Sequence, residues 1–78
     1  MSATKIEYNG ISIDPDIRFG KPCITGTRIS VSDVLQWLAS GMSKEEILDD
    51  YPELTIESIH AALSFAAHRD DISRIIAA

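Results

Sequence analysis

The stretch MSKEEILDDYPELTIESI, residues 42–59, contains two helix starts with a helix stop between them. Ser43 followed three residues later by Glu46 is the signature of a capping box, in which each side chain binds the backbone N–H of the other residue. Pro52 ends the first helix, because the residue before a proline disfavours helical backbone. Thr55 is then the N-cap of the next helix. The stretch therefore predicts two helices joined by a tight turn.

A third helix is predicted before this pair. Its apolar positions recur at helical spacing and are Val31, Val34, Leu35 and Leu38. Gly41 follows, where a left-handed residue commonly ends a helix. In the last helix the same spacing predicts a buried face made of Ile56, Ile59, Leu63 and Ala66. Three helices with a tight turn before the last one are the layout of a helix-turn-helix unit.

The front of the chain predicts a β-hairpin. In IEYNGISI, residues 6–13, the pair Asn9-Gly10 separates two alternating segments. A two-residue type I′ turn needs residues that accept positive φ, and this pair supplies them. The register places Tyr8 opposite Ile11 on one apolar face. That face needs a cover from elsewhere in the chain or from a partner.

The expected fold class is mainly α, with extended structure confined to the front. Cys23-Ile24 and Arg28-Ile29 are interpreted as short extended pieces that could pair around a turn. Residues 1–31 then form a β-hairpin and extended arm, and residues 32–68 form the three-helix helix-turn-helix unit. Residues 69–78 are a C-terminal tail or helix extension. All three parts belong to one domain, since a chain of this length is near the small end of what folds unaided.

Composition limits the class of protein. The chain has 78 residues, is 45% hydrophobic and carries a formal net charge of −5. It has no apolar run near the ~20 residues that span a membrane and no signal-peptide pattern, so we expect a cytoplasmic protein. Four cations and three acids precede Ser32, whereas three cations and nine acids follow from there. A second copy would add core to so small a chain, which favours a homodimer.

No catalytic, cofactor or metal site is predicted. Gly20-Lys21-Pro22 lacks the Ser or Thr that follows the lysine of a phosphate-binding loop. Cys23 has no base and orienting group placed for it, and we expect it to be a small buried hydrophobic residue. His60 and His68, together with a single cysteine, fall short of a four-ligand zinc pattern. We therefore do not expect an enzyme.

A helix-turn-helix unit reads bases with side chains near the start of its last helix. The candidate DNA-binding residues are Thr55, Ser58, His60 and Ser64, with Arg18, Lys21 and Arg28 as cations that could hold the phosphate backbone. DNA affinity comes largely from cations, and none of the four helix residues is Lys or Arg, so the isolated acidic domain should bind DNA weakly. The alternative is that Thr55 and Ser58 only cap the helix.

Five short motifs follow one another along the chain. They are Gly20-Lys21-Pro22, Gly26-Thr27-Arg28, Gly41, Tyr51-Pro52 and Ala61-Ala62. In this order they resemble the domain-of-unknown-function 433 family, and the resemblance covers roughly Ile11 to Ala67. It implies a homeodomain-like helix-turn-helix fold and a VapB-like antitoxin, which neutralises a PIN-like ribonuclease toxin and contacts operator DNA for autoregulation. The alternative function is a stand-alone helix-turn-helix DNA-binding or adaptor domain without a toxin partner.

Candidate partner-binding residues are Arg28 at the front and Phe65, Ile72, Arg74, Ile75 and Ile76 on and after the last helix. Phe65 belongs to a second apolar stripe with Ala62 and Ile72, which either packs on a second copy or covers the hairpin of its own chain. The segment after Ala67 could order on a partner. A PIN-like nuclease holds metal with carboxylates, so an inserted Arg28 or Arg74 could form bidentate pairs with them. The alternative is that both are ordinary solvated arginines.

Overall fold

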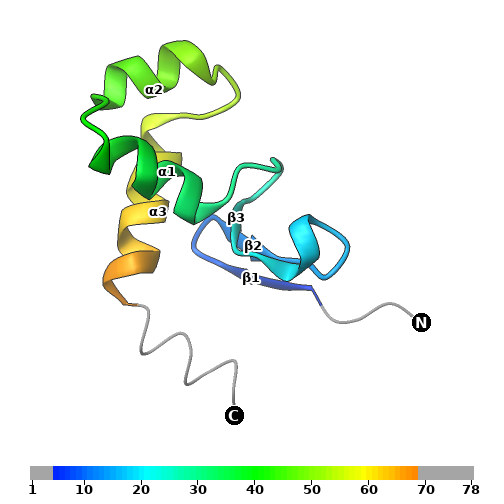
Figure 1. Ribbon diagram of the computed structural model, residues 1–78. Helices are drawn as coiled ribbons and strands as arrows, with labels where there is room; N and C mark the ends of the chain where they lie inside the picture. Colours follow the sequence, from blue (N-terminus) through cyan, green and yellow to red (C-terminus); the bar gives the residue numbers. More distant parts are fainter. Residues whose placement is uncertain (1–4, 69–78) are drawn as a thin grey trace.

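The computed structural model describes residues 5–68 and consists of a small antiparallel sheet beside three helices (Figure 1). The strands are β1 (Ile6–Tyr8), β2 (Ile11–Ile13) and β3 (Cys23–Ile24), and the helices are α1 (Val31–Ala39), α2 (Lys44–Asp50) and α3 (Ile56–Ala67). Helix α3 holds the parts together, because it packs against α1, α2, β2 and β3. Within residues 5–68, no helix has the length and apolar content needed to cross a membrane.

The predicted hairpin is confirmed in turn and register. Asn9 and Gly10 have φ values of 47° and 87°, as a type I′ turn requires. Tyr8 pairs with Ile11, and β1 and β2 run antiparallel. The turn also lies close to α3, since a Cβ atom placed on Gly10 would be 3.3 Å from the Cβ atom of Ala61. Glycine at this position therefore serves both the left-handed turn and the close approach of the helix.

The expectation of a mainly α fold with an extended arm is wrong, because the arm supplies a third strand. β3 pairs antiparallel with β2, with Ile24 opposite Ile11 and Cys23 opposite Ser12. The two short pieces expected to pair do so, since the Ile24 N–H donates to the Ile29 carbonyl oxygen at 2.9 Å. The protein is thus a three-stranded sheet combined with three helices. A two-residue strand has too few positions to show alternation, and its pairing depends on long-range contacts.

Each helix begins with a capping box. Ser43 and Glu46 form the predicted box at α2. At α3 the box also closes, with Ser58 in place of the usual acid, and it pairs with Thr55. The box at α1 was not predicted: the Ser30 Oγ atom accepts from the Asp33 N–H at 3.0 Å, and the Asp33 Oδ2 atom accepts from the Ser30 N–H at 3.2 Å.

The core lies between the sheet and the helices and comprises Ile11, Ile24, Ile29, Val31, Val34, Ile47, Leu54, Ile59, Ala62 and Phe65. The buried face predicted for α3 is partly wrong. Ile59 is fully buried, but Ile56 and Leu63 are 39% and 37% exposed. Ala62 and Phe65 are buried instead, and α3 packs against both α1 and the sheet. Within residues 5–68, α3 packs on β2 of the same chain, and packing of the second stripe on a second copy stays a prediction.

An aromatic pair connects α1 with the end of α2. The rings of Trp37 and Tyr51 are stacked, with centroids 4.0 Å apart and planes 11° from parallel. Tyr51 is the residue at which α2 ends, before Pro52. The residue at which α2 stops therefore also carries the ring that packs against α1.

Candidate functional site

The hydroxyl groups of Thr55 and Ser58 bind the backbone at the start of α3. The Ser58 N–H donates to the Thr55 Oγ1 atom at 3.2 Å, and the Thr55 N–H donates to the Ser58 Oγ atom at 3.1 Å. The two oxygens also lie 3.1 Å from each other. Both side chains thus form hydrogen bonds in the helix cap. Capping was the predicted alternative to the reading of bases.

The outward face of α3 carries a mixture of aliphatic, polar and acidic side chains. His60 and Ser64 are exposed on this helix, and so are Ile56 and Leu63. Glu57 is exposed in the first turn. The helix contains no lysine or arginine. This face offers aliphatic carbon and a carboxylate to a partner, and no cation for a phosphate.

Among the front cations, Arg18 is occupied within the chain. Its Nη1 atom donates to the carbonyl oxygen of Arg28 at 2.7 Å and lies 3.2 Å from the Oδ2 atom of Asp33. Partial burial alone would raise the pKa of Asp33, but hydrogen bonds from Ser30 and Arg18 outweigh it, and the pKa is lowered from its ordinary value of 3.8. Arg18 therefore fastens the front of the chain to the start of α1.

Lys21 and Arg28 are exposed cations at the front, where Lys5 is also exposed but pairs with Glu7. Neither Lys21 nor Arg28 forms an ion pair with a carboxylate of residues 5–68. Arg28 follows the Thr25–Thr27 turn, which is held by the Thr27 N–H donating to the Ile24 carbonyl oxygen at 3.0 Å. Of the three predicted front cations, these two are placed to meet an acidic or anionic partner.

The cysteine is part of the interior. Cys23 is 2% exposed, and burial raises the pKa of its thiol. A buried thiol with a raised pKa holds little of the reactive thiolate at neutral pH. Over the part of the chain that the structure describes, no three side chains of His, Cys, Asp or Glu gather as metal ligands would.

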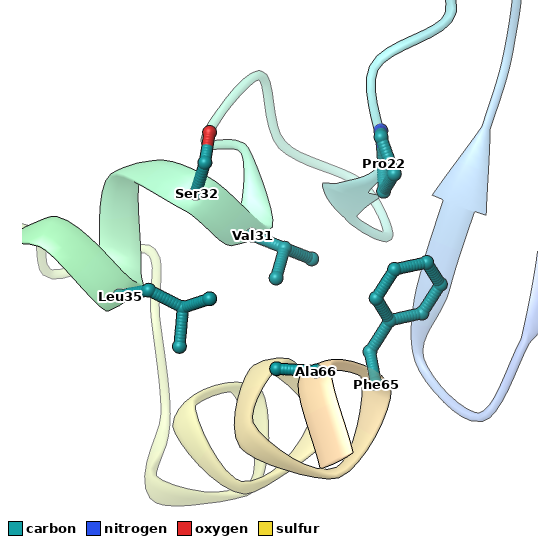
Figure 2. Close-up of a pocket in the computed structure, with 6 residues that line it drawn as sticks. All are labelled: Pro22, Val31, Ser32, Leu35, Phe65 and Ala66. Carbon is teal, nitrogen blue, oxygen red and sulfur yellow. The ribbon is translucent and has the colours of Figure 1, made fainter. Parts of the chain in front are cut away.

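A small apolar pocket opens between α1 and α3 (Figure 2). Its volume is about 180 Å³. The lining residues are Pro22, Val31, Ser32, Leu35, Phe65 and Ala66. Phe65, predicted as a partner contact, is 9% exposed and forms one wall with its ring. The other predicted partner contacts after α3, namely Ile72, Arg74, Ile75 and Ile76, lie outside the described residues.

The most exposed aromatic residue, Phe19, was not among the predicted site residues. Phe19 is 102% exposed, so its ring is not covered by any described residue. It lies in a turn in which Arg18, Phe19 and Gly20 all have positive φ, at 53°, 59° and 81°. Left-handed backbone at a residue other than glycine costs about 1 kcal/mol or more. Only Gly20 gave a local signal for this turn; the Arg18 hydrogen bonds that stabilise it join residues distant in the sequence.

The chain belongs to the family described as protein of unknown function (DUF433), whose model matches residues 11–66. Among solved structures it is similar to the crystal structure of a DUF433 member from Anabaena variabilis ATCC 29413. The two chains are 34% identical with a TM-score of 0.71, and the match covers 90% of this chain and 70% of the other.

A curated relative, uncharacterized protein y4eO of Sinorhizobium fredii (strain NBRC 101917 / NGR234), is 39% identical over 56 residues. The match covers 72% of this chain and 25% of the relative, so the chain spans about a quarter of that protein's length. Neither relative's name states an activity. The comparisons therefore establish the family and the fold.

Proposed function

We propose that this protein is an antitoxin-like binding protein that neutralises a PIN-like ribonuclease by direct contact. The observation that carries the proposal is the outward face of α3, where Ile56 and Leu63 are more than a third exposed. Protein interfaces bury such aliphatic groups at their centres. The class of partner comes from the family resemblance, because the motifs of this chain match proteins regarded as VapB-like antitoxins.

Charge favours a protein partner over nucleic acid. DNA binding depends on lysine and arginine side chains that release counterions from phosphate. The helix that would enter the groove has none, and its first turn presents Glu57. Its two hydroxyl groups nearest the start, on Thr55 and Ser58, are used in the cap. Contact with operator DNA, the second part of the expected antitoxin role, would rest on Lys21 and Arg28 and would be weak for one copy.

Arg28 gives the proposal a chemical mechanism. The catalytic site of a PIN-like nuclease is a cluster of carboxylates that holds metal ions. A guanidinium group placed among them forms bidentate, charge-assisted hydrogen bonds and competes with the metal. Arg28 is exposed and has no carboxylate partner among residues 5–68. Arg74 is the second candidate on the same chemical grounds and lies outside the described residues.

The first experiment measures complex formation with the PIN-like proteins of the same host. The full chain is titrated against each purified nuclease by calorimetry, and RNA cleavage is followed in parallel. We expect L63S to weaken the complex at least tenfold, because it removes an aliphatic group from the interface. Tyr8 is also exposed but lies on β1, so Y8S is the matched control. If L63S and Y8S bind the nuclease with equal affinity, α3 is not part of the interface.

The second experiment separates binding from inhibition. R28A is compared with K21A, since each removes one exposed cation from the same end of the chain. If Arg28 enters the carboxylate cluster, R28A will bind the nuclease but allow more RNA cleavage, and K21A will inhibit like the natural chain. R28A combined with R74A extends the test to both candidates. Unchanged inhibition by the double variant would refute the arginine mechanism.

The salt dependence of binding distinguishes the antitoxin proposal from the alternative of a stand-alone DNA-binding domain. An affinity that depends on phosphate contacts falls steeply as salt rises, whereas an apolar protein interface responds little. Tight, salt-sensitive binding to DNA by the chain alone, with no PIN-like partner, would replace the antitoxin proposal by that alternative.

A further inference from the structure

The exposed ring of Phe19 and the apolar pocket beside α1 are close together on one chain. Pro22, which forms one edge of the pocket, is three residues after Phe19, and three residues span at most about 11 Å. Phe19 is an apolar projection and the pocket is an apolar recess. We propose that two copies of this chain exchange Phe19 rings, each ring filling the pocket of the other copy.

The pocket has the size and lining that a phenyl ring needs. Its volume of about 180 Å³ can be compared with the cavity of about 150 Å³ that binds benzene in another protein. Figure 2 shows Val31, Leu35 and Phe65 directed into the space between the two helices and Pro22. Except for Ser32, every lining residue is apolar. An entering ring would meet aliphatic groups and the Phe65 ring, with which it can pack edge to face.

The backbone holds Phe19 away from its own chain. Three successive residues with positive φ, Arg18 to Gly20, form the turn that carries the ring. The turn is closed by the Lys21 N–H, which donates to the Arg18 carbonyl oxygen at 3.1 Å. The Arg18 side chain anchors it to Asp33 and to the Arg28 carbonyl oxygen. These contacts fix the ring in an outward position, where a second copy can receive it.

The nearness of ring and pocket suits a two-fold arrangement. In a two-fold interface the same surface is used on both subunits, so a projection and a recess on one face are satisfied together. If the two copies are related by a two-fold axis, the ring of each enters the pocket of the other in the same interface, and the assembly closes as a dimer. Stable dimers bury about 1,200–2,000 Å² and an aromatic side chain about 150–250 Å². Two rings are a fraction of this area, so we expect a dissociation constant in the micromolar range.

This dimer does not depend on the antitoxin proposal, because it rests on the Phe19 ring and is measured without a nuclease. The pocket is lined on α3 by Phe65 and Ala66, whereas the proposed nuclease contact is centred on Ile56 and Leu63. The two proposals can therefore fail separately.

The test is sedimentation equilibrium of the full chain from low micromolar to near-millimolar concentration. The natural chain should dimerise, and F19N should be monomeric or bind itself about 100-fold more weakly, because two rings are lost. Asparagine tolerates the left-handed backbone better than phenylalanine, so F19N should melt no lower than the natural monomer. Y8N, which removes the other exposed aromatic residue of the front, should leave the dimer unchanged.

A66L fills the pocket and should also prevent dimerisation. Mixing A66L with F19N is the sharper test, since a mixed dimer has one intact ring and one open pocket that match. The mixture should associate more strongly than either variant alone and less strongly than the natural chain. A natural chain that stays monomeric at every concentration overturns the proposal, and so does a dimer that F19N leaves intact. If A66L alters folding while F19N leaves the sedimentation mass unchanged, the pocket belongs to another segment of the same chain. That result would also overturn the proposal.

Discussion

The Nη1 atom of Arg18 lies 3.2 Å from the Oδ2 atom of Asp33, which joins the turn at the front of the chain to the first turn of α1. The same carboxylate accepts from the Ser30 N–H in the capping box. One carboxyl group therefore stabilises the helix start and fixes the turn that carries Phe19. The ion pair with Arg18 needs the ionised form of the acid, and the hydrogen bond from the Ser30 N–H is stronger with it.

Protonation of Asp33 should destabilise the protein at low pH. Its pKa in the folded chain is below the ordinary value of 3.8, so as pH falls the unfolded chain takes up the proton first. The stability that Asp33 contributes is present above this value and is lost as pH falls below it toward the lowered pKa.

At pH 7, D33N should reduce the free energy of unfolding by about 0.5–1 kcal/mol, because the ion pair is partly exposed. Thermal melting from pH 7 to pH 3 should show that the difference in stability between D33N and the natural chain becomes smaller. D49N is the control, since Asp49 is exposed at the end of α2 and pairs with no cation of residues 5–68. A constant difference across the pH range would contradict the role of the charge.

Removing the N-cap of α3 should lower the stability of the protein rather than change its specificity for DNA bases. T55A deletes the oxygen that accepts from the Ser58 N–H, and the loss of an N-cap costs about 1 kcal/mol. Urea unfolding measures the change. T55S retains the acceptor and should recover most of the loss. If T55A leaves stability unchanged, the hydroxyl is not acting as the cap.

Two aliphatic residues on α3 should respond very differently to truncation. Ile59 is fully buried, and I59A should cost about 2–5 kcal/mol, enough to unfold a domain of this size in large part. Leu63 lies one turn further along and is 37% exposed, so L63A should cost about 1 kcal/mol or less. Circular dichroism during heating compares the two. Similar losses for both would mean that α3 is rotated relative to the face described above.

Cys23 should be protected from thiol reagents in the folded protein. It is 2% exposed and its pKa is raised by burial, and both effects slow alkylation. Iodoacetamide labelling followed by mass spectrometry should be slow in buffer and fast in denaturant. C23A should fold with a modest loss of stability, whereas C23S should lose more because it buries a hydroxyl group. Rapid labelling without denaturant would show that the segment opens locally.

Local signals in the sequence predicted most of the helices and the hairpin. Asn9-Gly10 specified a turn that few other residue pairs can form, and Ser43 with Glu46 specified the start of α2. These features depend on residues within four positions of each other. They do not depend on what packs against them.

The features that were missed depend on contacts between distant segments. Cys23-Ile24 was predicted as an extended piece, but its place as β3 in the sheet depends on the pairing of Ile24 with Ile11. Helical spacing alone could not show which side of α3 would meet the sheet. For this reason Leu63 was placed in the core, and the stripe of Phe65 was left open between a second copy and the hairpin of its own chain. The left-handed conformation of Phe19 depends on Arg18 reaching Arg28 and Asp33, residues that are 10 and 15 positions away. The predicted tail contacts after Ala67 stay predictions.

The stacked pair of Trp37 and Tyr51 gives the protein an intrinsic fluorescent probe at a defined place. The chain has a single tryptophan, and its indole ring lies 4.0 Å from the tyrosine ring, measured between centroids. All tryptophan emission therefore arises where α1 meets the end of α2. Fluorescence can follow the separation of these two helices during unfolding or partner binding without any added label.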